Sequence, residues 1–450
     1  MAEIKKILIA NRGEIVQRAV RTIREMGKKS VAIYSAGDKN ASYLKHADEA
    51  VCIGGAKSSE SYLNIPAIIT AAEMTGCDAI FPGYGFLSEN QDFVEICRLH
   101  NIKFIGPSVE VMEKMADKSK AKEEMIRAGV PVVPGSKGSV HSVTEGKKVA
   151  LEIGYPIMAK AAAGGGGRGM RLIHDESEFD QLFMAASSEA LAAFGDGTMY
   201  LERFINNPRH IEVQVVGDSH GNAIHIGERD CSLQRRHQKV IEESPAILLN
   251  DETRANLHDV AVRATKYLKY EGAGTFEFLA DDKQNIYFME MNTRLQVEHP
   301  VSEMVSGIDI VELMIKVAEG EKVPPQESIK FRGHAIECRI TAEDPNSFLP
   351  SPGKVTQWMV PGGRNVRVDS HVYTNYIVPP YYDSMIGKLI VWGRDRNKAI
   401  NIMKRALAEF EVEGIRTTIP FHQKMMENED FISNNYDTKY LENYKNLDEL

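Results

Sequence analysis

Two glutamates stand on either side of a predicted hairpin in the middle of the chain. The segment GTFEFLADDKQNIYFMEMN, residues 274–292, contains two apolar-rich runs that flank a polar turn. If the runs pair symmetrically about Lys283 and Gln284, Glu277 stands directly opposite Glu290. Side chains in that position have Cβ atoms roughly 4.5–5.5 Å apart. The pattern therefore predicts two carboxylates in close opposition.

Opposed carboxylates repel each other unless water or a cation compensates their charge. Asn292 shares the face of Glu290, because side chains repeat every two residues along a strand. Carboxylate and amide oxygens suit Mg²⁺ or Mn²⁺, which proteins often share with substrate phosphates. An exposed strand face with unpaired charges is the alternative. The apolar neighbours Phe276 and Phe288 leave little polar surface there and favour a metal site.

A second group of polar residues follows at once, in TRLQVEHP. Alternation along an extended segment predicts Arg294, Gln296 and Glu298 on one side. An arginine can hold a planar oxyanion through two parallel hydrogen bonds, and a glutamate can act as a general base. An Arg–Glu pair four residues apart is also a common surface ion pair. The position next to the predicted metal ligands favours a catalytic role.

Basic side chains gather in RDCSLQRRHQKVIEESP, residues 229–245, within an acidic protein. The residues concerned are Arg229, Arg235, Arg236, His237 and Lys239. Such a cluster is either a solvated face or a site for nucleotide phosphate and a small anion. Cys231, in the same segment, has no motif partner and is expected to be a packing residue.

A glycine run in KAAAGGGGRGMRL, residues 160–172, joins two predicted strands. Glycine loses the most conformational freedom on folding, so four in succession cost stability. The loop is either a flexible tip or a flap whose bare amides close on phosphates. The chain contains neither the standard P-loop nor the dinucleotide-binding glycine pattern. Any phosphate cradle is therefore expected in this loop.

Composition narrows the class of protein. The chain has 450 residues, of which 43% are hydrophobic and 26% charged, as in ordinary soluble globular proteins. Its net charge of −9 argues against a general nucleic-acid-binding protein. The five cysteines form no C-x-x-C pair, which favours a reducing compartment. No apolar run suits a signal peptide or a membrane span, so we expect a cytoplasmic protein without membrane attachment.

The apolar patterns predict the elements that position these residues. Short apolar runs alternate with helical patterns over the first hundred residues, which indicates a parallel sheet covered by helices on both faces. The predicted strands are 6–10, 30–35, 49–54, 78–83 and 103–106, and the predicted helices are 13–27, 65–75 and 91–100. Two more helices are expected within 108–129.

Later segments predict a different organisation. A small α/β unit from 131 to about 203 carries the glycine loop between strands 155–163 and 170–174. From about 204 onward strand patterns dominate, at 210–218, 223–232, 274–280, 285–292, 334–340 and 385–393. Helices are expected near 252–269, 307–319 and 397–410.

Together these segments resemble the biotin carboxylases of the ATP-grasp superfamily. The resemblance runs essentially end to end, through ILIANRGEI, FPGYGFLSEN, KAAAGGGGRGM, NNPRHIEVQ, ERDCSLQRRHQKVIEESP, GTFEF, MEMNTRLQVEHPVSE and RGHAIECRITAEDP. The segment LERFI has Arg203 where many relatives have lysine, and the loop AAAGGGG differs from those with a fifth glycine or a serine. Both departures bear on ATP affinity more than on the reaction.

The resemblance implies an α/β and α+β ATP-grasp fold. It implies an N-terminal doubly wound parallel-sheet domain at 1–112 and linking helices at 113–130. A mobile lid at 131–203 and a C-terminal antiparallel-sheet catalytic domain at 204–450 follow, with ATP between them. The ATP-grasp region spans about 122–318.

The same resemblance assigns the ATP site residue by residue. Phosphate contacts fall to Lys118, Lys160, Gly166 and Gly167. Adenine contacts fall to Glu202, Arg203, Phe204 and Ile205, and ribose and phosphate contacts to His210, Gln234 and His237. Glu277 and Glu290 are similar to the family's Mg²⁺ ligands beside ATP, with Asn292 on a second ion.

The bicarbonate pocket of the family matches Lys239, Arg294, Gln296, Val297 and Glu298. Arg339 matches the residue that meets the ureido oxygen of biotin, and Tyr84 is similar to one lining that pocket. The implied catalytic residues are Arg294, Glu298, Lys239 and Arg339. The implied chemistry is deprotonation of bicarbonate by Glu298, formation of carboxyphosphate from ATP, and carboxylation of biotin N1.

The resemblance also implies partners. The lysine in NIMKRAL, residues 401–407, lies in a helical pattern and not in a biotin-carrying hairpin. We therefore expect a homodimeric subunit that acts with a biotin carboxyl carrier protein and carboxyltransferase subunits. Acetyl-CoA carboxylase in fatty-acid synthesis is the expected complex, and a two-subunit pyruvate carboxylase or another acyl-CoA carboxylase is the alternative. An ATP-grasp ligase for another acceptor and a non-catalytic nucleotide-binding module are the rival hypotheses.

Overall fold

The computed structural model describes residues 3–161, 169–236 and 238–444, without the side chains of residues 118–119 and 193–194. The chain forms two compact units. The first comprises Met1–Val130, Arg209–Phe278 and Glu290–Leu450, and the second comprises Pro131–Pro208 and Leu279–Met289.

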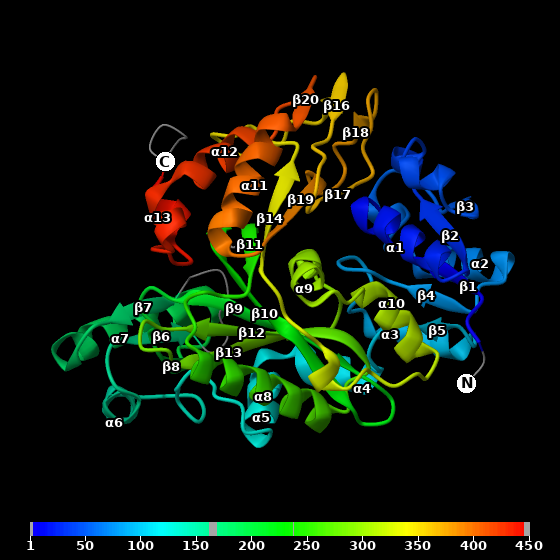
Figure 1. Ribbon diagram of the computed structural model, residues 1–450. Helices are drawn as coiled ribbons and strands as arrows, with labels where there is room; N and C mark the ends of the chain where they lie inside the picture. The colour runs from blue at the N-terminus through cyan, green and yellow to red at the C-terminus, as the bar shows by residue number, and fades with distance from the viewer. Residues whose placement is uncertain (1–2, 162–168, 237, 445–450) are drawn as a thin grey trace. The chain divides into compact units, whose positions relative to one another are not determined.

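The first unit begins with a five-stranded parallel sheet (Figure 1). Its strands are β1 (Lys6–Ile9), β2 (Lys29–Tyr34), β3 (Glu49–Cys52), β4 (Ala79–Phe81) and β5 (Lys103–Phe104). The helices between them are α1 (Glu14–Glu25), α2 (Ile65–Thr75) and α3 (Gln91–Leu99). The spatial order β3-β2-β1-β4-β5 starts in the middle and grows towards both edges, which confirms the predicted doubly wound arrangement.

Burial on both faces explains the apolar character of the central strand. Ile7 and Ile9 of β1 lie in one core cluster, whereas Leu8 between them lies in another. Parallel sheets covered by helices on both faces require this pattern. Helix α1 buries Ile15, and the chain leaves it through Gly27, whose φ of 71° suits glycine.

The second unit has its own sheet and core. Strand β6 (Ile157–Ala161) pairs antiparallel with β7 (Met170–Ile173) and β8 (Met199–Arg203). Helices α6 (Val143–Ile153) and α7 (Glu176–Phe194) pack on this sheet. The N–H of Ala161 donates to the carbonyl of Gly169, so the strands flanking the glycine loop pair as predicted.

The largest sheet has eight strands and carries most of the candidate site. In spatial order these are β13 (Ile286–Asn292), β12 (Gly272–Ala280), β9 (Arg209–Gly217), β10 (Ala223–Arg235), β11 (Gln238–Ser244), β14 (His334–Thr341), β19 (Met385–Gly393) and β17 (Val366–Ser370). The pairs from β9 to β17 are antiparallel, as the resemblance to the ATP-grasp family implied.

Further helices and ribbons complete the described chain. The helices are α4 (Val109–Ala116), α5 (Lys118–Arg127), α8 (Asp251–Leu268), α9 (His299–Ser306), α10 (Ile310–Ala318), α11 (Arg396–Glu409), α12 (Ile419–Glu427) and α13 (Glu429–Ser433). Two ribbons pair β15 (Gly353–Lys354) with β18 (Ile377–Val378) and β16 (Gln357–Met359) with β20 (Glu411–Glu413). The NIMKRAL segment lies inside α11, as predicted.

Two helices cover opposite faces of the largest sheet where β14 and β19 run side by side (Figure 1). Val301 and Val305 of α9 pack on Ala335 and Ile390. Helix α11 belongs to the other core cluster, which contains Ile336 and Leu389. Successive residues of β14 therefore point alternately towards α9 and towards α11.

The hairpin at 274–292 turns at a position other than the predicted one. The N–H of Asp281 donates to the carbonyl of Asn285 at 3.0 Å, so the turn is centred on Lys283. A register that continued unbroken from this turn would place Glu277 opposite Met289. The predicted direct opposition of the two glutamates therefore does not follow from the turn.

The extended segment predicted after this hairpin is wrong. Strand β13 ends at Asn292, residues 293–298 form bends and turns, and α9 begins at His299. Pro300 lies in the first turn of α9, where its missing N–H is tolerated. Helix α9 was not predicted, whereas α10 corresponds to the helix expected near 307–319.

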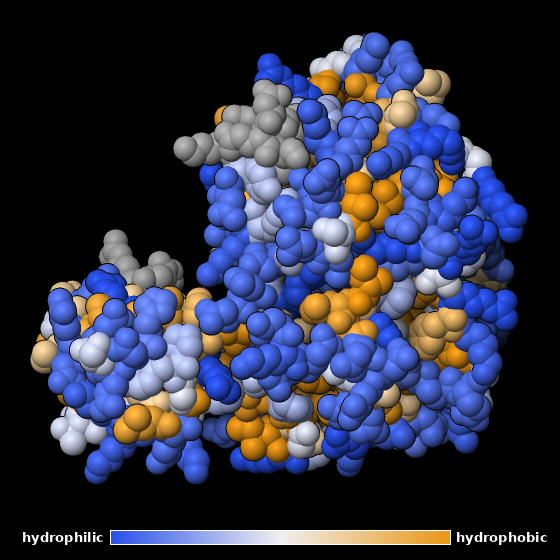
Figure 2. Space-filling model, turned by 60° about the vertical axis from the view of Figure 1, so that its left-hand side comes forward, coloured by the Kyte–Doolittle hydropathy of each residue, from blue (hydrophilic) through white to orange (hydrophobic). Residues whose placement is uncertain are grey.

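The surface is mixed in character. Figure 2 shows a largely hydrophilic face with smaller hydrophobic patches between the polar side chains. Among the described residues, no helix has both the length and the apolar character that crossing a membrane requires.

Candidate active site

Lys239 stands at the centre of a buried group of carboxylates, here called the Lys239 cluster. Its Nζ donates to Glu298 at 2.7 Å and to Glu277 at 3.1 Å, and it also contacts Glu212. The partners come from β9, β12 and the turn before α9. Burial alone would lower the pKa of Lys239, but Glu212, Glu298 and Glu277 raise it well above its usual value. The ammonium is therefore charged at neutral pH.

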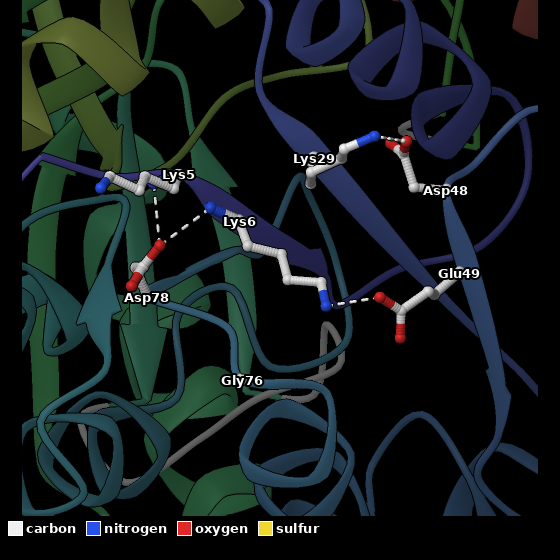
Figure 3. A pocket seen from close by; sticks show the side chains of 7 residues that line it. All are labelled: Lys5, Lys6, Lys29, Asp48, Glu49, Gly76 and Asp78. Carbon is white, nitrogen blue, oxygen red and sulfur yellow. Dashed lines mark hydrogen bonds and ion pairs between the residues drawn. The ribbon is translucent and has the colours of Figure 1, made fainter.

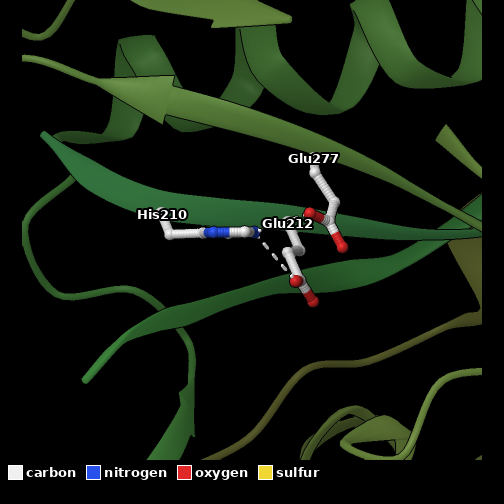
Figure 4. Close-up of side chains that lie close together, drawn as sticks. All are labelled: His210, Glu212 and Glu277. Atoms are coloured by element: carbon white, nitrogen blue, oxygen red, sulfur yellow. Dashed lines mark ion pairs between the residues drawn. The ribbon is translucent and has the colours of Figure 1, made fainter. Parts of the chain in front are cut away.

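His210 and Glu212 reach the cluster from the same strand, β9 (Figure 4). The Nε2 atom of His210 lies 3.1 Å from Glu212 and 3.0 Å from Glu277. Burial would lower the pKa of His210, but Glu277 and Glu212 raise it to about 9. Gln234 lies 2.9 Å from Nδ1 of His210. Two predicted ATP contacts, His210 and Gln234, thus lie beside the predicted metal ligand Glu277.

Glu277 is held by donors from three directions. Its Oε1 accepts from Asn292 at 2.6 Å, from Gln296 at 2.7 Å and from Lys239. Burial would raise the pKa of Glu277, but Lys239 and His210 hold it well below its usual value. Glu290 is half-buried on the neighbouring strand β13. Two carboxylates and an amide oxygen from adjacent strands are a donor set that fits Mg²⁺.

Arg229 is a buried structural residue and not part of a solvated basic face. Its guanidinium bonds Glu212, Gln214 and Gln296, at 3.0, 2.8 and 2.5 Å. The side chain has no exposed surface. Because its planar donor fork joins β9 to the turn before α9, Arg229 fixes Glu212 and the predicted pocket residue Gln296 relative to each other.

Arg294 lies in the turn after β13 and is positioned by Glu89. Its Nε donates to Glu89 at 2.8 Å, and one Nη donates to the Asn292 amide oxygen at 2.8 Å. Glu89 also accepts from the backbone and hydroxyl of Thr293, at 3.0 and 3.1 Å. The turn that carries the predicted anion-binding arginine is therefore tied to the segment that follows β4.

Glu298 is held between two cations, because Arg339 lies on the opposite side from Lys239. The Nη2 atom of Arg339 donates to Oε2 of Glu298 at 3.1 Å, and its Nε donates to Glu242 at 2.6 Å. Burial would raise the pKa of Glu298, but Lys239 and Arg339 keep it below its usual value. The carboxylate is therefore ionised at neutral pH and able to accept a proton.

Two further predicted residues approach the same region. The carbonyl of Val297 accepts from the fully buried Lys388 at 2.7 Å. The hydroxyl of Tyr84 donates to Glu14, which forms an ion pair with Lys388 at 3.1 Å. Arg339 acts on the pKa of Tyr84, which burial raises well above its usual value. Val297 and Tyr84 thus belong to one network, connected through Lys388 and Glu14.

Cys231 is buried and free, as expected of a packing residue. Its sulfur also lies within 4.8 Å of carboxylate oxygens of Glu212 and Glu298. Burial and Glu212 raise the pKa of the thiol well above its usual value, so the thiol is protonated.

The second unit holds the other predicted ATP residues that the structure describes. Lys160 on β6 donates to Glu202 on β8 at 2.6 Å, and both side chains are partly exposed. The backbone of Phe204 donates to Pro156 at 2.9 Å, and Ile205 is buried. Arg203 is exposed at the end of β8. Gly166, Gly167 and His237 lie outside the described residues, as does the side chain of Lys118.

Several site residues were not predicted. Glu212 could have been found, because the strand period of two places it on the same face as His210. Glu89 and Lys388 carried no such signal, because their partners are 205 and 91 residues away in the chain. Only the tertiary fold brings these pairs together.

A pocket of about 550 Å³ lies at the amino ends of the parallel strands (Figure 3). Its lining includes Lys6 paired with Glu49, and Lys29 paired with Asp48 at 2.9 Å. Ligands of open α/β sheets bind at the carboxyl ends of the strands. We therefore place the candidate site at the Lys239 cluster and not in this pocket.

Comparisons with known proteins cover nearly the whole chain. The sequence matches three family models: the biotin carboxylase N-terminal domain at residues 3–112, the ATP binding domain of the carbamoyl-phosphate synthase L chain at 117–326, and the biotin carboxylase C-terminal domain at 337–443. The three matches together span most of the chain.

Individual relatives extend over nearly the whole length. A biotin carboxylase of Nostoc sp. is 56% identical, over 97% of this chain and 98% of that protein. A pyruvate carboxylase subunit of Methanothermobacter thermautotrophicus is 51% identical, over 98% of this chain and 90% of that protein. The crystal structure of a biotin carboxylase complex from Campylobacter jejuni is 68% identical, covers 98% of this chain and 99% of that chain, and superposes with a TM-score of 0.89. The chain belongs to the biotin carboxylase family, whose members are ATP-dependent ligases that form a carbon–nitrogen bond when they carboxylate biotin.

Proposed function

We propose that this chain uses ATP and bicarbonate to carboxylate biotin attached to a separate carrier protein, with the Lys239 cluster as its reactive centre. The observation that carries the proposal is the position of Glu298, 2.7 Å from Lys239 and 3.1 Å from Arg339. A buried base between two fixed cations suits proton abstraction from a small anion. Both cations remain charged when the proton moves.

Bicarbonate activation is the first step. Lys239 and Arg294 bind the anion, and Gln296 and Val297 complete the pocket. Glu298 takes the hydroxyl proton, and the freed oxygen attacks the γ-phosphorus of ATP. The bond from that phosphorus to the bridging oxygen breaks, so carboxyphosphate forms and ADP leaves.

The metal site would consist of Glu277, Glu290 and Asn292, whose oxygen donors fit a hard cation. Bound Mg²⁺, or Mn²⁺ in its place, neutralises negative charge on the phosphates. Asn292 and Gln296 orient Glu277 through hydrogen bonds of 2.6 and 2.7 Å. Replacing either amide is therefore expected to disturb metal affinity.

The remaining ATP contacts are proposed from the family pattern. Residues 131–203 form the lid, Gly166 and Gly167 present backbone amides to the phosphates, and Lys118 and Lys160 add charge. Residues 202–205 hold adenine, and His210, Gln234 and His237 meet ribose and phosphate. The buried His210 supports this assignment, because its pKa of about 9 keeps it cationic beside the phosphates.

Carboxylation of biotin is the second part of the proposed reaction. Carboxyphosphate separates into CO₂ and phosphate, and phosphate takes the proton from biotin N1. Arg339 stabilises the negative charge that develops on the ureido oxygen, and Tyr84 lines the pocket. The nitrogen lone pair then attacks CO₂, which forms the new carbon–nitrogen bond.

The carboxyl group must then pass to a further acceptor. We propose a homodimer that acts with a biotin carboxyl carrier protein and carboxyltransferase subunits, as in acetyl-CoA carboxylase of fatty-acid synthesis. Similarity to a pyruvate carboxylase subunit favours pyruvate as the second candidate acceptor. The five free cysteines, four of them buried, support a reducing, cytoplasmic location.

The proposal is tested with the purified chain, Mg²⁺, ATP, bicarbonate and free biotin. We expect ADP release that requires bicarbonate and increases with biotin, with ¹⁴C from labelled bicarbonate recovered on biotin. A matched reaction without biotin measures uncoupled ATP hydrolysis. ADP release without label on biotin would contradict the proposal and favour another ATP-grasp ligase.

A further inference from the structure

A second buried carboxyl lies directly across the sheet from Glu242 and takes no part in the chemistry derived above. Glu337 on β14 is the register partner of Glu242 on β11. Neither residue has any exposed surface. Side chains at directly opposed positions of an antiparallel pair have Cβ atoms about 5 Å apart. Two acidic groups are therefore buried side by side.

Glu242 supports Arg339 through one of its two oxygens. Oε1 accepts from Nε of Arg339 at 2.6 Å and forms an ion pair with Nη2 at 2.5 Å. The same guanidinium reaches Glu298 at 3.1 Å. The orientation of Arg339 therefore depends on Glu242 as well as on the base.

The other carboxyl oxygens in this space have no partner. Among the described residues, Oε2 of Glu242 and both oxygens of Glu337 are buried without a hydrogen bond. Leaving a buried polar group unpaired is expensive, and native structures rarely tolerate several together. A single proton on Glu337 gives that residue a donor, and the unpartnered Glu242 oxygen opposite is an acceptor.

The charges around Glu337 also require a proton. Glu242 faces it from β11, Lys388 from β19 and Arg339 from its own strand, and Glu298 and the Lys388 partner Glu14 lie beyond. Lys388 and Arg339 thus lie among four carboxyl groups, of which Glu298 is also paired with Lys239. Helix α9, which covers this face, adds His299, whose pKa burial and Lys388 hold well below its usual value. His299 is therefore neutral and supplies no counter-charge.

The pKa values of Glu337 and Glu242 are consistent with a proton shared in this group of charges. Burial raises the pKa of Glu337 well above its usual value, and Glu242 raises it further. Burial raises the pKa of Glu242 to about 7, although Arg339 opposes the shift. Because Arg339 bonds Glu242 and no described donor bonds Glu337, we assign the proton to Glu337.

We propose that Glu337 is a positioning residue for Arg339: it stays protonated and donates to Glu242, which leaves the other oxygen of Glu242 to hold the guanidinium. This inference rests on the role of Arg339 in binding biotin proposed above. Deprotonation of Glu337 would place a second negative charge beside Glu242 and weaken the fixed geometry of Arg339.

Two substitutions of similar size test the proton. E337Q keeps an N–H donor towards Glu242 and cannot titrate, whereas E337L removes the donor. We expect the KM for free biotin of E337Q to stay within about threefold of the parent protein, and that of E337L to rise about tenfold or more, as for a lost buried hydrogen bond. The KM for ATP should be unchanged in both.

The pH dependence separates positioning from packing. In the parent protein the KM for biotin should rise in alkaline solution as Glu337 loses its proton, and in E337Q this rise should disappear. E243Q is the matched control, because Glu243 is buried on the same strand as Glu242 but bonds a different set of residues. E243Q should lower stability and keep the alkaline rise. Equal losses in E337Q and E337L, or an alkaline rise that persists in E337Q, would overturn the proposal.

Infrared spectroscopy gives a readout that needs no activity. The intact parent protein at neutral pH should show a carbonyl band of protonated carboxyl groups that loses intensity in E337Q. An unchanged band would overturn the inference. If the band is lost but the parent protein does not carboxylate biotin, the carboxyl pair stands and the proposed function fails.

Discussion

Two neighbouring glutamates on β11 have opposite environments, although both are fully buried. Glu243 accepts from Arg396 at 2.6 and 3.1 Å, from His334 at 2.7 Å and from Tyr436 at 2.5 Å. Glu242 accepts, among the described residues, from Arg339 alone and leaves one oxygen unpaired. One face of β11 therefore carries Glu243, whose two oxygens both accept hydrogen bonds, and the other face carries Glu242, of which only one oxygen does.

The pKa values move in opposite directions for this reason. Burial would raise the pKa of Glu243, but His334 and Arg396 hold it well below its usual value. The pKa of Glu242 is raised to about 7, because burial outweighs the effect of Arg339. Complete pairing indicates a structural role, whereas incomplete pairing with a shifted pKa is typical of a reactive site. The comparison teaches that burial alone does not distinguish the two roles.

The largest effect is expected at Glu298, which shares the guanidinium of Arg339 with Glu242. Glu298→Gln removes the proposed base, so turnover should fall about 10²- to 10⁴-fold. Steady-state kinetics measure kcat, and calorimetric titration with ATP measures nucleotide binding, which should change little. A variant with near-normal kcat would assign the proton transfer to another group.

Replacement of the fully paired glutamate, Glu243→Gln, should reduce the stability of the fold and not the turnover. The change leaves Arg396 buried without its counter-ion, which costs about 3–5 kcal/mol. Urea denaturation measures the free energy of unfolding, and kcat per folded molecule should remain near that of the parent. Glu429→Gln, at an exposed helix start, is the control and should unfold like the parent. A stable E243Q with a low kcat would contradict the purely structural role of Glu243.

An intermediate effect is expected at Arg339. Arg339→Lys keeps the charge but loses the planar donor fork that spans Glu242 and Glu298. We expect the KM for biotin to rise about 10- to 100-fold, as for a charge-assisted hydrogen bond of about 1.5–3 kcal/mol. Bicarbonate-dependent ATP hydrolysis without biotin serves as the internal control. If that hydrolysis falls equally, Arg339 acts in the first half-reaction as well.

The pH dependence of stability should have opposite signs at the two glutamates. The raised pKa of Glu242 favours folding at acidic pH, and this contribution is lost as pH rises from about 4 towards 7. The lowered pKa of Glu243 stabilises the fold at neutral pH, and that contribution is lost only below about pH 4. Relative to the parent, E242Q should therefore gain stability between pH 5 and about pH 7, while E243Q keeps a constant deficit. Urea denaturation across this range measures both, and parallel curves would contradict the assignment.

The smallest effect is expected far from this strand. Lys29 is largely exposed and pairs with Asp48 at the pocket of Figure 3. Lys29→Met should change the free energy of unfolding by less than about 1 kcal/mol, as for other surface ion pairs. The same urea denaturation and biotin assay apply. A marked loss of activity would show that this pocket takes part in function.

Much of the site could be predicted from local patterns. Glu277, Asn292 and Gln296 were predicted as neighbours, and the structure joins them by hydrogen bonds. The centre of the turn was not predicted correctly, because the turn is centred on Lys283, half a position from the assumed centre. Strand periodicity predicts the face of the sheet on which a side chain lies, but the geometry of the turn decides which residue stands opposite it on the neighbouring strand.

Long-range contacts could not be predicted in the same way. Arg229 was predicted in a basic cluster that was either a solvated face or an anion site, yet it is buried against Glu212 and Gln296. The pairing of Arg339 with Glu242 spans 97 residues of sequence. No local pattern records such partners, because they meet only when β11 and β14 become neighbours.

Motifs along the chain indicated the family and the types of reactive groups, and apolar patterns indicated the doubly wound start of the chain and the many strands of its later half. These follow from residue types and from spacings of a few positions. The tertiary structure alone decided which carboxyl groups are ionised and which side chain holds which. The charge of a buried acid depends on desolvation and on its nearest counter-ions, and both are supplied by residues distant in the chain.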